Sequence, residues 1–432
     1  MVKYRKSILA NGIRVLSEAH AQSQVLSLSI WIDAGSSDEE KKFSGMAHLI
    51  EHMVFKGTKK YSAYNLVANL EAVGADINAF TSRENTCFHT LSLGEHMDLA
   101  LDVLSELVNR AEFPKEEFDK ERQVVTQELR MGQDSPEEHI FDMFFEKAYP
   151  NLAVGQPITG TMKSLKSITR DKLIKYYRKR YVGDNMYVIA IGAVDHDKLV
   201  KKVDALLGGL PKGEKTQKPM VSSLIPFAKV VDRDLEHVHV LFGLPAPHFL
   251  DPWRIEGAIV SSIVGGGMAS RLYQEVREKQ ALVYSIYTYQ HTQFDTGVEF
   301  IYSSTEPKRV KKLLTCLFDQ IDRLRTDGIS KKEIEMAKTQ LRGQILLAAE
   351  EHDFRMGSLA VGEMLFGSYR SIENIIDEVE AVKPRRVNDY VQKFWDPEKM
   401  GIMLLGPVEE NRTIDLISKL MAKMTKTTKT TK

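Results

Sequence analysis

The segment HLIEH, residues 48–52, places three titratable side chains inside an otherwise apolar helical stretch. At about 100° per residue, His48 and His52 lie on nearly the same helix face, so both imidazoles can point at one metal ion. Glu51 lies about 60° from His48 and can reach a ligand on that ion. This H-x-x-E-H order is the inverse of the H-E-x-x-H zinc-binding signature, and both orders place a carboxylate where it can act as a general base.

A catalytic zinc site needs a third protein ligand and one open position, so another segment must contribute. The best candidates are Glu121 and Glu128 in KEEFDKERQVVTQELR, which are seven residues apart and share one helix face. One carboxylate can bind the ion while the other holds an imidazole, or the first carboxylate, in place. The residues alone do not decide which glutamate has which role.

The composition of the chain restricts both its class and its chemistry. With 432 residues it is longer than a single hydrophobic core usually organises, so we expect two or more domains. Basic and acidic residues both number 59, so no bulk charge indicates a nucleic-acid partner or an anionic membrane surface. The two cysteines, Cys87 and Cys316, are far apart, which argues against a disulfide scaffold and against a thiolate zinc site.

The N-terminal residues show no targeting signal. The sequence MVKYRKSILANGIRVLSEAH lacks the apolar region of a secretory signal and instead predicts a first β-hairpin. No apolar run is long enough to span a bilayer. We therefore expect a cytoplasmic protein without a membrane partner.

The chain contains a long internal repeat. FPKEEFDKE at 113–121 returns as ISKKEIEMA at 329–337, an offset of 216 residues, and NMYVIAIGAV at 185–194 is echoed by KMGIMLLGPV at 399–408. Residues 208–226, rich in Gly, Pro, Lys and Ser, are predicted to be a linker. We expect a metal-binding domain at 1–207, a homologous domain at 227–423 and a disordered basic tail at 424–432.

The second copy of the repeat lacks the candidate ligands. Aligning GMAHLIEH at 45–52 with GMASRLYQ at 267–274 sets His48, Glu51 and His52 against Ser270, Tyr273 and Gln274, while Glu121 and Glu128 become Ala337 and Gln344. Because the second copy folds without these side chains, we interpret them as functional. The alternatives are buried histidines capped by a glutamate and a structural zinc, although a structural zinc normally has four ligands and commonly cysteine.

The sequence resembles the pitrilysin/insulinase family of inverted zincins, particularly the branch of processing peptidases. GMAHLIEHMVFKGT is similar to the zinc helix of that family, and Glu128, 76 positions after His52, matches its distal glutamate ligand. Glu121 matches the accompanying glutamate one heptad earlier. The resemblance spans residues 5 to about 420. It implies an α+β chain of two homologous domains related by pseudo-two-fold symmetry, each an antiparallel-dominated sheet with helices packed on it, which together form half of a clamshell.

The resemblance also implies roles for individual residues. His48, His52 and Glu128 would hold one Zn²⁺ per chain, and Glu51 would be the catalytic base. In REKQALVY, Arg277 and Tyr284 match a pair that contacts substrate near the scissile bond. The family often has Arg-Gly-Leu-Ala-Tyr where this chain has Gln-Ala-Leu-Val-Tyr.

The segment DINAFTSRENT is similar to the edge strand beside the zinc helix of that family. An exposed strand edge can accept an extended peptide as an added strand, with affinity from main-chain hydrogen bonds. Asn78, Ala79 and Phe80 are therefore the candidate substrate-binding residues. Without the resemblance, an ordinary edge strand is the simpler interpretation.

These expectations combine into a functional hypothesis. The chain is predicted to be a zinc-dependent endopeptidase that cleaves extended or unfolded peptides in an enclosed chamber. Since the chain carries both the zinc residues and the Arg-Tyr pair, a homodimer completed in trans is the economical arrangement, and a heterodimer with a homologous subunit is the alternative. The competing function is a non-catalytic chamber or binding subunit that pairs with a homologous peptidase.

Overall fold

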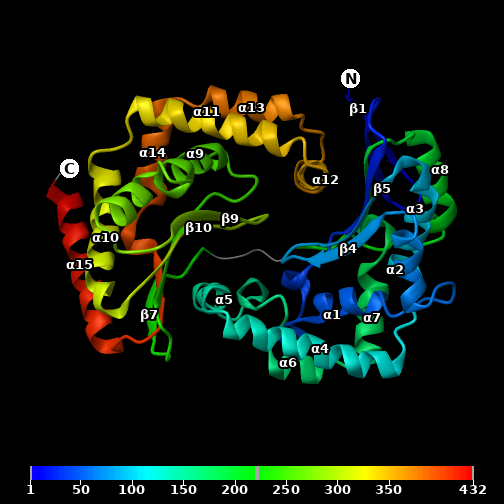
Figure 1. Ribbon diagram of the computed structural model, residues 1–432, viewed down its shortest axis with the longest axis horizontal. Coiled ribbons are helices and arrows are strands. Elements are labelled where there is room, and N and C mark those ends of the chain that lie inside the picture. Colours follow the sequence, from blue (N-terminus) through cyan, green and yellow to red (C-terminus); the bar gives the residue numbers. More distant parts are fainter. Residues whose placement is uncertain (1, 219–222, 431–432) are drawn as a thin grey trace. The chain divides into compact units, whose positions relative to one another are not determined.

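The computed structural model describes residues 2–218 and 223–430, and the chain divides into two compact units (Figure 1). Neither unit is a continuous half of the chain. The first unit consists of Met1–Met131, Leu152–Pro219 and Ala348–Arg370. The second consists of Gly132–Asn151, Met220–Leu347 and Ser371–Lys432.

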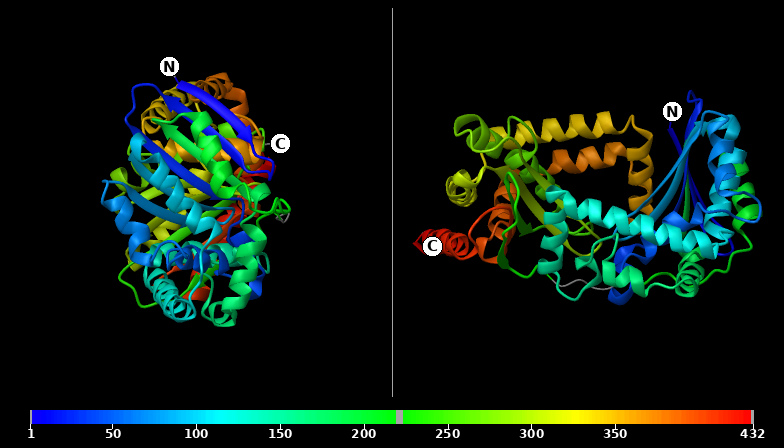
Figure 2. Two further views of the ribbon diagram at one scale, coloured as in Figure 1. Left: turned by 90° about the vertical axis from the view of Figure 1, so that its right-hand side faces the viewer. Right: turned by 60° about the horizontal axis from the view of Figure 1, so that its bottom comes forward.

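The first unit is built on a six-stranded sheet, whose blue, light blue and green strands lie side by side in Figure 2. The strand order is β1-β2-β6-β3-β5-β4, and only the β2–β6 pair is parallel. The strands are β1 (Val2–Ile8), β2 (Arg14–His20), β3 (Val25–Ile32), β4 (Asp76–Thr81), β5 (Thr86–Leu93) and β6 (Met186–Gly192). The edge position of β4, paired only with β5 among the described strands, matters for the site described below.

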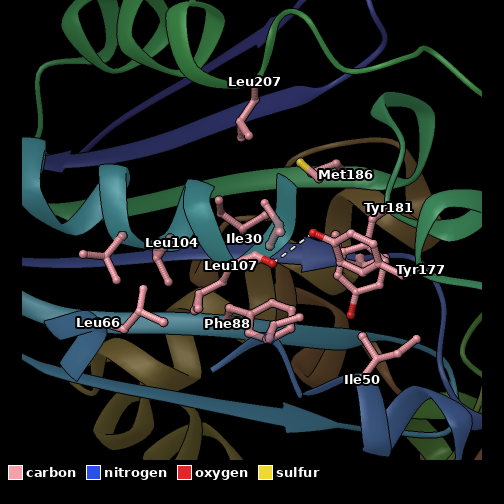
Figure 3. Packing of buried hydrophobic residues seen from close by; sticks show 14 of the residues in the cluster. Ile30, Ile50, Leu66, Phe88, Leu104, Leu107, Tyr177, Tyr181, Met186 and Leu207 are labelled. Carbon is pink, nitrogen blue, oxygen red and sulfur yellow. Dashed lines mark hydrogen bonds between the residues drawn. The ribbon is translucent and has the colours of Figure 1, made fainter. Parts of the chain in front are cut away.

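Helices cover one face of this sheet because the alternate side chains of its strands are apolar there. Ile50 from the helix that carries the HLIEH motif packs in the same core as Phe88 of β5 and two tyrosines, Tyr177 and Tyr181 (Figure 3). The Tyr177 hydroxyl donates a hydrogen bond to the Leu107 carbonyl at 3.0 Å, so its polar atom is satisfied inside the core. The helices are α1 (Met46–Val54), α2 (Ala63–Glu71), α3 (Met97–Asn109), α4 (Lys115–Asp134), α6 (Met162–Ser167), α7 (Arg170–Arg180) and α8 (His196–Leu207).

The second unit repeats the strand order of the first. Its sheet has the order β7-β11-β8-β10-β9, with only β7–β11 parallel. The strands are β7 (Phe227–Val231), β8 (Val238–Pro245), β9 (Ile286–Thr292), β10 (Gly297–Thr305) and β11 (Gly401–Leu405). The helices include α9 (Arg254–Gly265), α10 (Val310–Thr326), α11 (Lys331–Ala348), α13 (Ile372–Ala381), α14 (Pro384–Phe394) and α15 (Glu410–Thr430). The predicted α+β class, with two antiparallel-dominated sheets each packed with helices, is confirmed.

Two helices at equivalent places in the repeat are exchanged between the units. Helix α5 (Pro136–Ala148), from the first half, packs on β8 and β11 of the second unit. Helix α12 (His352–Val361), from the second half, packs on β3 and β6 of the first unit. The fit is close, because a side chain at Gly243 of β8 would begin 2.2 Å from the Phe144 ring of α5. The expected contiguous domains at 1–207 and 227–423 did not include this exchange.

The exchanged helix α12 is fixed to the first sheet by buried charge. Arg355 forms a bidentate ion pair with Glu18 of β2, and both side chains are buried. The Ser27 hydroxyl donates to the Met356 sulfur at 3.8 Å, and Met356 packs with Trp31 of β3. Since breaking one partner of a buried pair leaves an uncompensated charge, this contact holds α12 on that face.

The order of elements corrects one step in the sequence alignment. Helix α1 follows β3, and the helix that follows β8 is α9, so α9 is the counterpart of α1. The segment 267–274 lies one element later and was aligned because of the shared string Gly-Met-Ala. Helix α9 also contains no histidine, and its Glu256 is bound to Arg386. The second copy therefore still lacks the metal ligands, although at other positions than the alignment gave.

Part of the predicted linker is anchored to the first unit. Within 208–218, Lys218 contacts Asp33 at 3.0 Å and Asp38 at 2.9 Å. Residues 219–222 of the linker lie outside the described residues. Helix α15 extends from Glu410 to Thr430, and the disorder expected from residue 424 stays a prediction. Residues 431–432 lie outside the described residues.

Among the described residues, no helix has both the length and the apolar composition needed to cross a bilayer. The cytoplasmic location stays a prediction.

Candidate metal centre

The polar side chains of the HLIEH motif lie on one face of helix α1 because the opposite face packs into the core. Leu49, Ile50, Met53 and Val54 are completely buried, which leaves the remaining face for the polar side chains. The His48 and His52 rings lie 4.7 Å apart, centroid to centroid, on that remaining face. The two imidazoles are thus brought together as the i, i+4 spacing predicts.

Helix α4 supplies the third candidate metal ligand, and its geometry separates the roles of the two glutamates. One carboxylate oxygen of Glu128 lies 3.5 Å from His48 Nε2, and the other lies 3.4 Å from His52 Nε2. One ligand atom from each of these three residues falls within 4.8 Å of the other two. Glu128 therefore lies where a third ligand is expected, as the family resemblance implies, although the spacing of the two glutamates left their roles open.

Glu121 has the other role. Its carboxylate lies 3.2 Å from His52 Nδ1, the nitrogen that faces away from Glu128, and 2.7 Å from Lys56 Nζ. A carboxylate can only accept here, so the contact makes Nδ1 the protonated nitrogen and leaves the Nε2 lone pair for the site. Lys56 balances the charge of this buried carboxylate. Glu121 thus orients an imidazole without joining the donor set.

The electrostatics of the cluster show how strongly its members interact. Hydrogen bonds to His48 and then to His52 hold the pKa of Glu128 well below its usual range. Burial by itself lowers the pKa of His52, but the contacts with Glu128 and Glu121 outweigh burial and raise it. The cluster therefore places an ionised carboxylate beside two imidazoles. Two imidazole nitrogens and one carboxylate, with a position left open, are a donor set that suits a catalytic zinc ion.

Glu51 lies beside this cluster and outside the donor set. Its carboxylate accepts a hydrogen bond of 2.5 Å from the Thr81 hydroxyl. Thr81 is the last residue of β4, so the edge strand holds the predicted base directly. We did not single out Thr81 from the sequence. Its signal was the alternation of β4, which puts Thr81 on the same face as the partly buried Ile77 and Ala79.

The three predicted substrate-binding residues differ in environment. Asn78 and Phe80 are exposed, and the Phe80 ring meets the edge of Trp31 at 5.4 Å between centroids. The side chain of Ala79 instead packs against the core. The Asn78 side chain accepts a hydrogen bond from the Ala79 N–H at 2.8 Å. Their role in binding substrate stays a prediction.

Arg277 and Tyr284 lie together in the second unit. The guanidinium of Arg277 is 5.3 Å from the centroid of the Tyr284 ring and also contacts Tyr273. Tyr284 is 83% exposed, so its ring is available to a ligand. The preceding Ala281 has a φ of +49°, a left-handed conformation that favours glycine, at the position where the family often has one. The turn is therefore kept in this chain, at some cost in backbone strain.

The loop that carries Tyr284 is anchored to the end of β10 and to Arg309, the residue before α10. The Thr305 hydroxyl donates to the Leu282 carbonyl at 2.6 Å, and Arg309 donates to the Ala281 carbonyl. A hollow of about 540 Å³ lies against this loop, with Tyr284 on its wall. These contacts hold the strained turn in place.

Comparison with known proteins agrees with the fold and the site. Residues 14–162 match the family model described as "Insulinase (Peptidase family M16)", and residues 167–341 match the model described as "Peptidase M16 inactive domain". An uncharacterized zinc protease of Mycobacterium tuberculosis is 32% identical over 415 residues, which cover 95% of this chain and 94% of the relative. Uncharacterized zinc protease YmxG of Bacillus subtilis is 31% identical, covering 92% and 97%.

Solved structures share the same fold. A protease from Helicobacter pylori superposes with a TM-score of 0.86 at 20% sequence identity, covering 94% of this chain and all of that chain. A "peptidase M16 inactive domain" structure from Pseudomonas fluorescens gives a TM-score of 0.88 at 19% identity, covering 94% and 98%. The two-unit fold, with a His-His-Glu set of candidate metal ligands in the first unit, is the fold of a class of zinc proteases. The chain belongs to the insulinase family, peptidase family M16, which confirms the resemblance seen in the sequence.

Proposed function

We propose that this protein is a zinc-dependent endopeptidase that hydrolyses extended or unfolded peptides. The observation that carries the proposal is the convergence of His48, His52 and Glu128 within 4.8 Å, with Glu51 held beside them by the edge strand. The relatives are named zinc proteases, which supports the same interpretation. Glu121 adds support, since an imidazole that binds a metal usually donates its other ring N–H to a carboxylate, as His52 Nδ1 can to Glu121 at 3.2 Å.

The residues of the site have separate tasks in this proposal. His48, His52 and Glu128 hold the ion, which when bound polarises the peptide carbonyl and lowers the pKa of a water molecule. Glu51 accepts the proton of the attacking water and passes it to the leaving amine. The Thr81 hydroxyl, 2.5 Å from Glu51, keeps that carboxylate in one orientation.

The edge strand β4 gives the substrate its extended form. A peptide added beside β4 forms main-chain hydrogen bonds and runs past Thr81 and therefore past Glu51. Main-chain bonding selects for an unfolded backbone more than for particular side chains. Asn78 and Phe80 are the exposed side chains that such a peptide meets.

Incubating the full-length chain with a library of unstructured peptides tests the proposal. We expect cleavage inside the peptides with zinc present, loss of cleavage with a metal chelator, and recovery when zinc is restored. Mass spectrometry of the products gives the cleavage positions. Absence of cleavage by the zinc-loaded chain would contradict the proposal and favour the non-catalytic subunit.

We also propose that the active species is a homodimer whose chamber uses Arg277 and Tyr284 of the partner. The zinc residues and this pair belong to different units of the chain, so one chain can donate them to two different sites. A guanidinium and a phenol can bind carbonyl oxygens or stabilise a developing oxyanion. A heterodimer with a homologous subunit is the alternative assembly.

Mixing two inactive variants tests the assembly. Glu51→Gln and Arg277→Ala chains are each expected to be inactive, and their mixture is expected to recover up to about a quarter of wild-type activity, the share of fully intact sites under random pairing. Peptide cleavage and sedimentation velocity are the measurements, with each variant mixed with itself as the control. If the mixture is no more active than either variant alone, the trans arrangement is wrong.

A further inference from the structure

We infer that Glu39 is a positioning residue for the metal centre. Its side chain caps the N-terminus of α1 and thereby fixes the position of His48. Glu39 lies seven residues before Met46, the first residue of α1, in the charged run DEEKK. Such a run is typical of a solvent-exposed loop, yet the Glu39 side chain is buried, with only 7% of its surface exposed. Its two carboxylate oxygens face the first turn of the helix that carries the HLIEH motif.

The geometry is that of a two-point cap. One oxygen of Glu39 accepts from the Gly45 N–H at 2.7 Å, and the other accepts from the Ala47 N–H at 2.6 Å. These N–H groups belong to the first turn, where no helical carbonyl can accept them. Ala47 directly precedes His48, so the cap fixes the backbone from which the first histidine projects.

Helix α1 needs an outside cap because its own N-cap position cannot supply one. That position is Gly45, which has no side chain and a φ of +91°. A Cβ at Gly45 would lie 2.6 Å from the Thr159 carbonyl oxygen, so Ser, Asp or Asn is excluded there. A helix of only nine residues is marginal without such support.

The burial of Glu39 has a clear cost, which argues for a purpose. Burial raises the pKa of Glu39 to about 8, and the N–H groups of Ala47 and Gly45 oppose that rise. Burying an acidic side chain is tolerated only when its oxygens are hydrogen-bonded, and both Glu39 oxygens are bonded to N–H groups at the start of α1. The two short hydrogen bonds to the start of the metal-binding helix are a contribution of Glu39 that packing alone does not explain.

The test is the zinc affinity of Glu39→Gln, and it rests on the proposed zinc site. Glutamine keeps the size of the side chain but turns one acceptor into a donor that faces an N–H group. We expect zinc affinity to fall about tenfold or more, the effect of losing a partner that orients a ligand. The measurement is competition for zinc with a chromophoric chelator in the full-length chain, together with circular dichroism of the metal-free protein.

The second unit provides a matched control in Glu299→Gln. Glu299 is equally buried, its pKa is also raised by burial to about 8, and one of its oxygens accepts from Ser261 at 2.7 Å. We expect this variant to keep wild-type zinc affinity. If Glu39→Gln does not fold, Glu39→Asp keeps the carboxylate but is too short to accept both N–H groups, and the same loss of affinity is expected.

The outcomes separate this inference from the proposed function. A wild-type chain that binds no zinc would overturn the metal site itself. A wild-type chain that binds zinc, with folded Glu39 variants of the same affinity, would overturn the role of Glu39 alone. An equal loss in Glu299→Gln would also overturn it, because the effect would then follow from burial of any carboxylate.

Discussion

Glu51→Gln is expected to lower peptide cleavage by about 10²–10⁴-fold while zinc stays bound, the range that general acid–base catalysis contributes. Glutamine can still accept the hydrogen bond from Thr81, so the side chain keeps its place. It cannot take a proton from water, so the chemical step is lost. Glu51 is not a member of the donor set, and the affinity for zinc should therefore be that of the wild type.

Cleavage rates, zinc content and circular dichroism measured on the same preparation check this result. Glu71→Gln, at the exposed end of α2 in the same unit, makes the same chemical change without reaching the site and should keep full activity. If Glu51→Gln cleaves as fast as the wild type, the proposed base is wrong. If it loses zinc as well as activity, Glu51 belongs to the donor set.

The second large effect is expected at the glutamate pair of α4, where the two members should differ. Glu128→Gln removes a donor that lies within 3.5 Å of both imidazoles, and zinc affinity should fall by more than the roughly 10–100-fold typical of a residue that only orients a ligand. Glu121→Gln removes the partner of His52 Nδ1 and should stay within that range. Zinc competition gives both affinities.

This pair is its own control, because both changes are the same substitution on one helix face. A larger loss for Glu121→Gln would reverse the assignment of ligand and orienting residue. Equal and small losses would mean that neither glutamate completes the donor set. The metal-free Glu128→Gln chain should remain folded, since Glu128 is about half exposed and lies outside the core. Glu121 is buried and paired with Lys56, so circular dichroism of the metal-free Glu121→Gln chain is measured alongside its zinc affinity.

The sequence predicted the members of the site better than their arrangement. The i, i+4 spacing of the histidines and the seven-residue spacing of the glutamates are helical periods, and a sequence displays those directly. Which glutamate binds depends on how α4 is turned toward α1, and this rotation is set by core contacts from distant segments. For that reason the helical spacing identified Glu121 and Glu128 but left their roles open, and only the family resemblance predicted Glu128 as the ligand.

The missed residues have physical reasons of their own. Glu39 stands in a run of charges, a pattern typical of an exposed loop, and only the fold shows that it turns inward. Thr81 is an ordinary strand residue until α1 is placed against β4. The shared string Gly-Met-Ala misled the internal alignment, because three matching letters cannot outweigh the order of strands and helices.

The exchange of α5 and α12 was equally invisible, since an amphipathic pattern shows that a helix has an apolar face but not which sheet that face covers. Its consequence concerns how the two halves of the chain depend on each other. Each sheet is covered on one face by a helix that comes from the other half of the sequence. Neither half of the polypeptide can therefore complete its own sheet packing alone, and the second half is needed for the fold of the first even though it carries none of the candidate metal ligands.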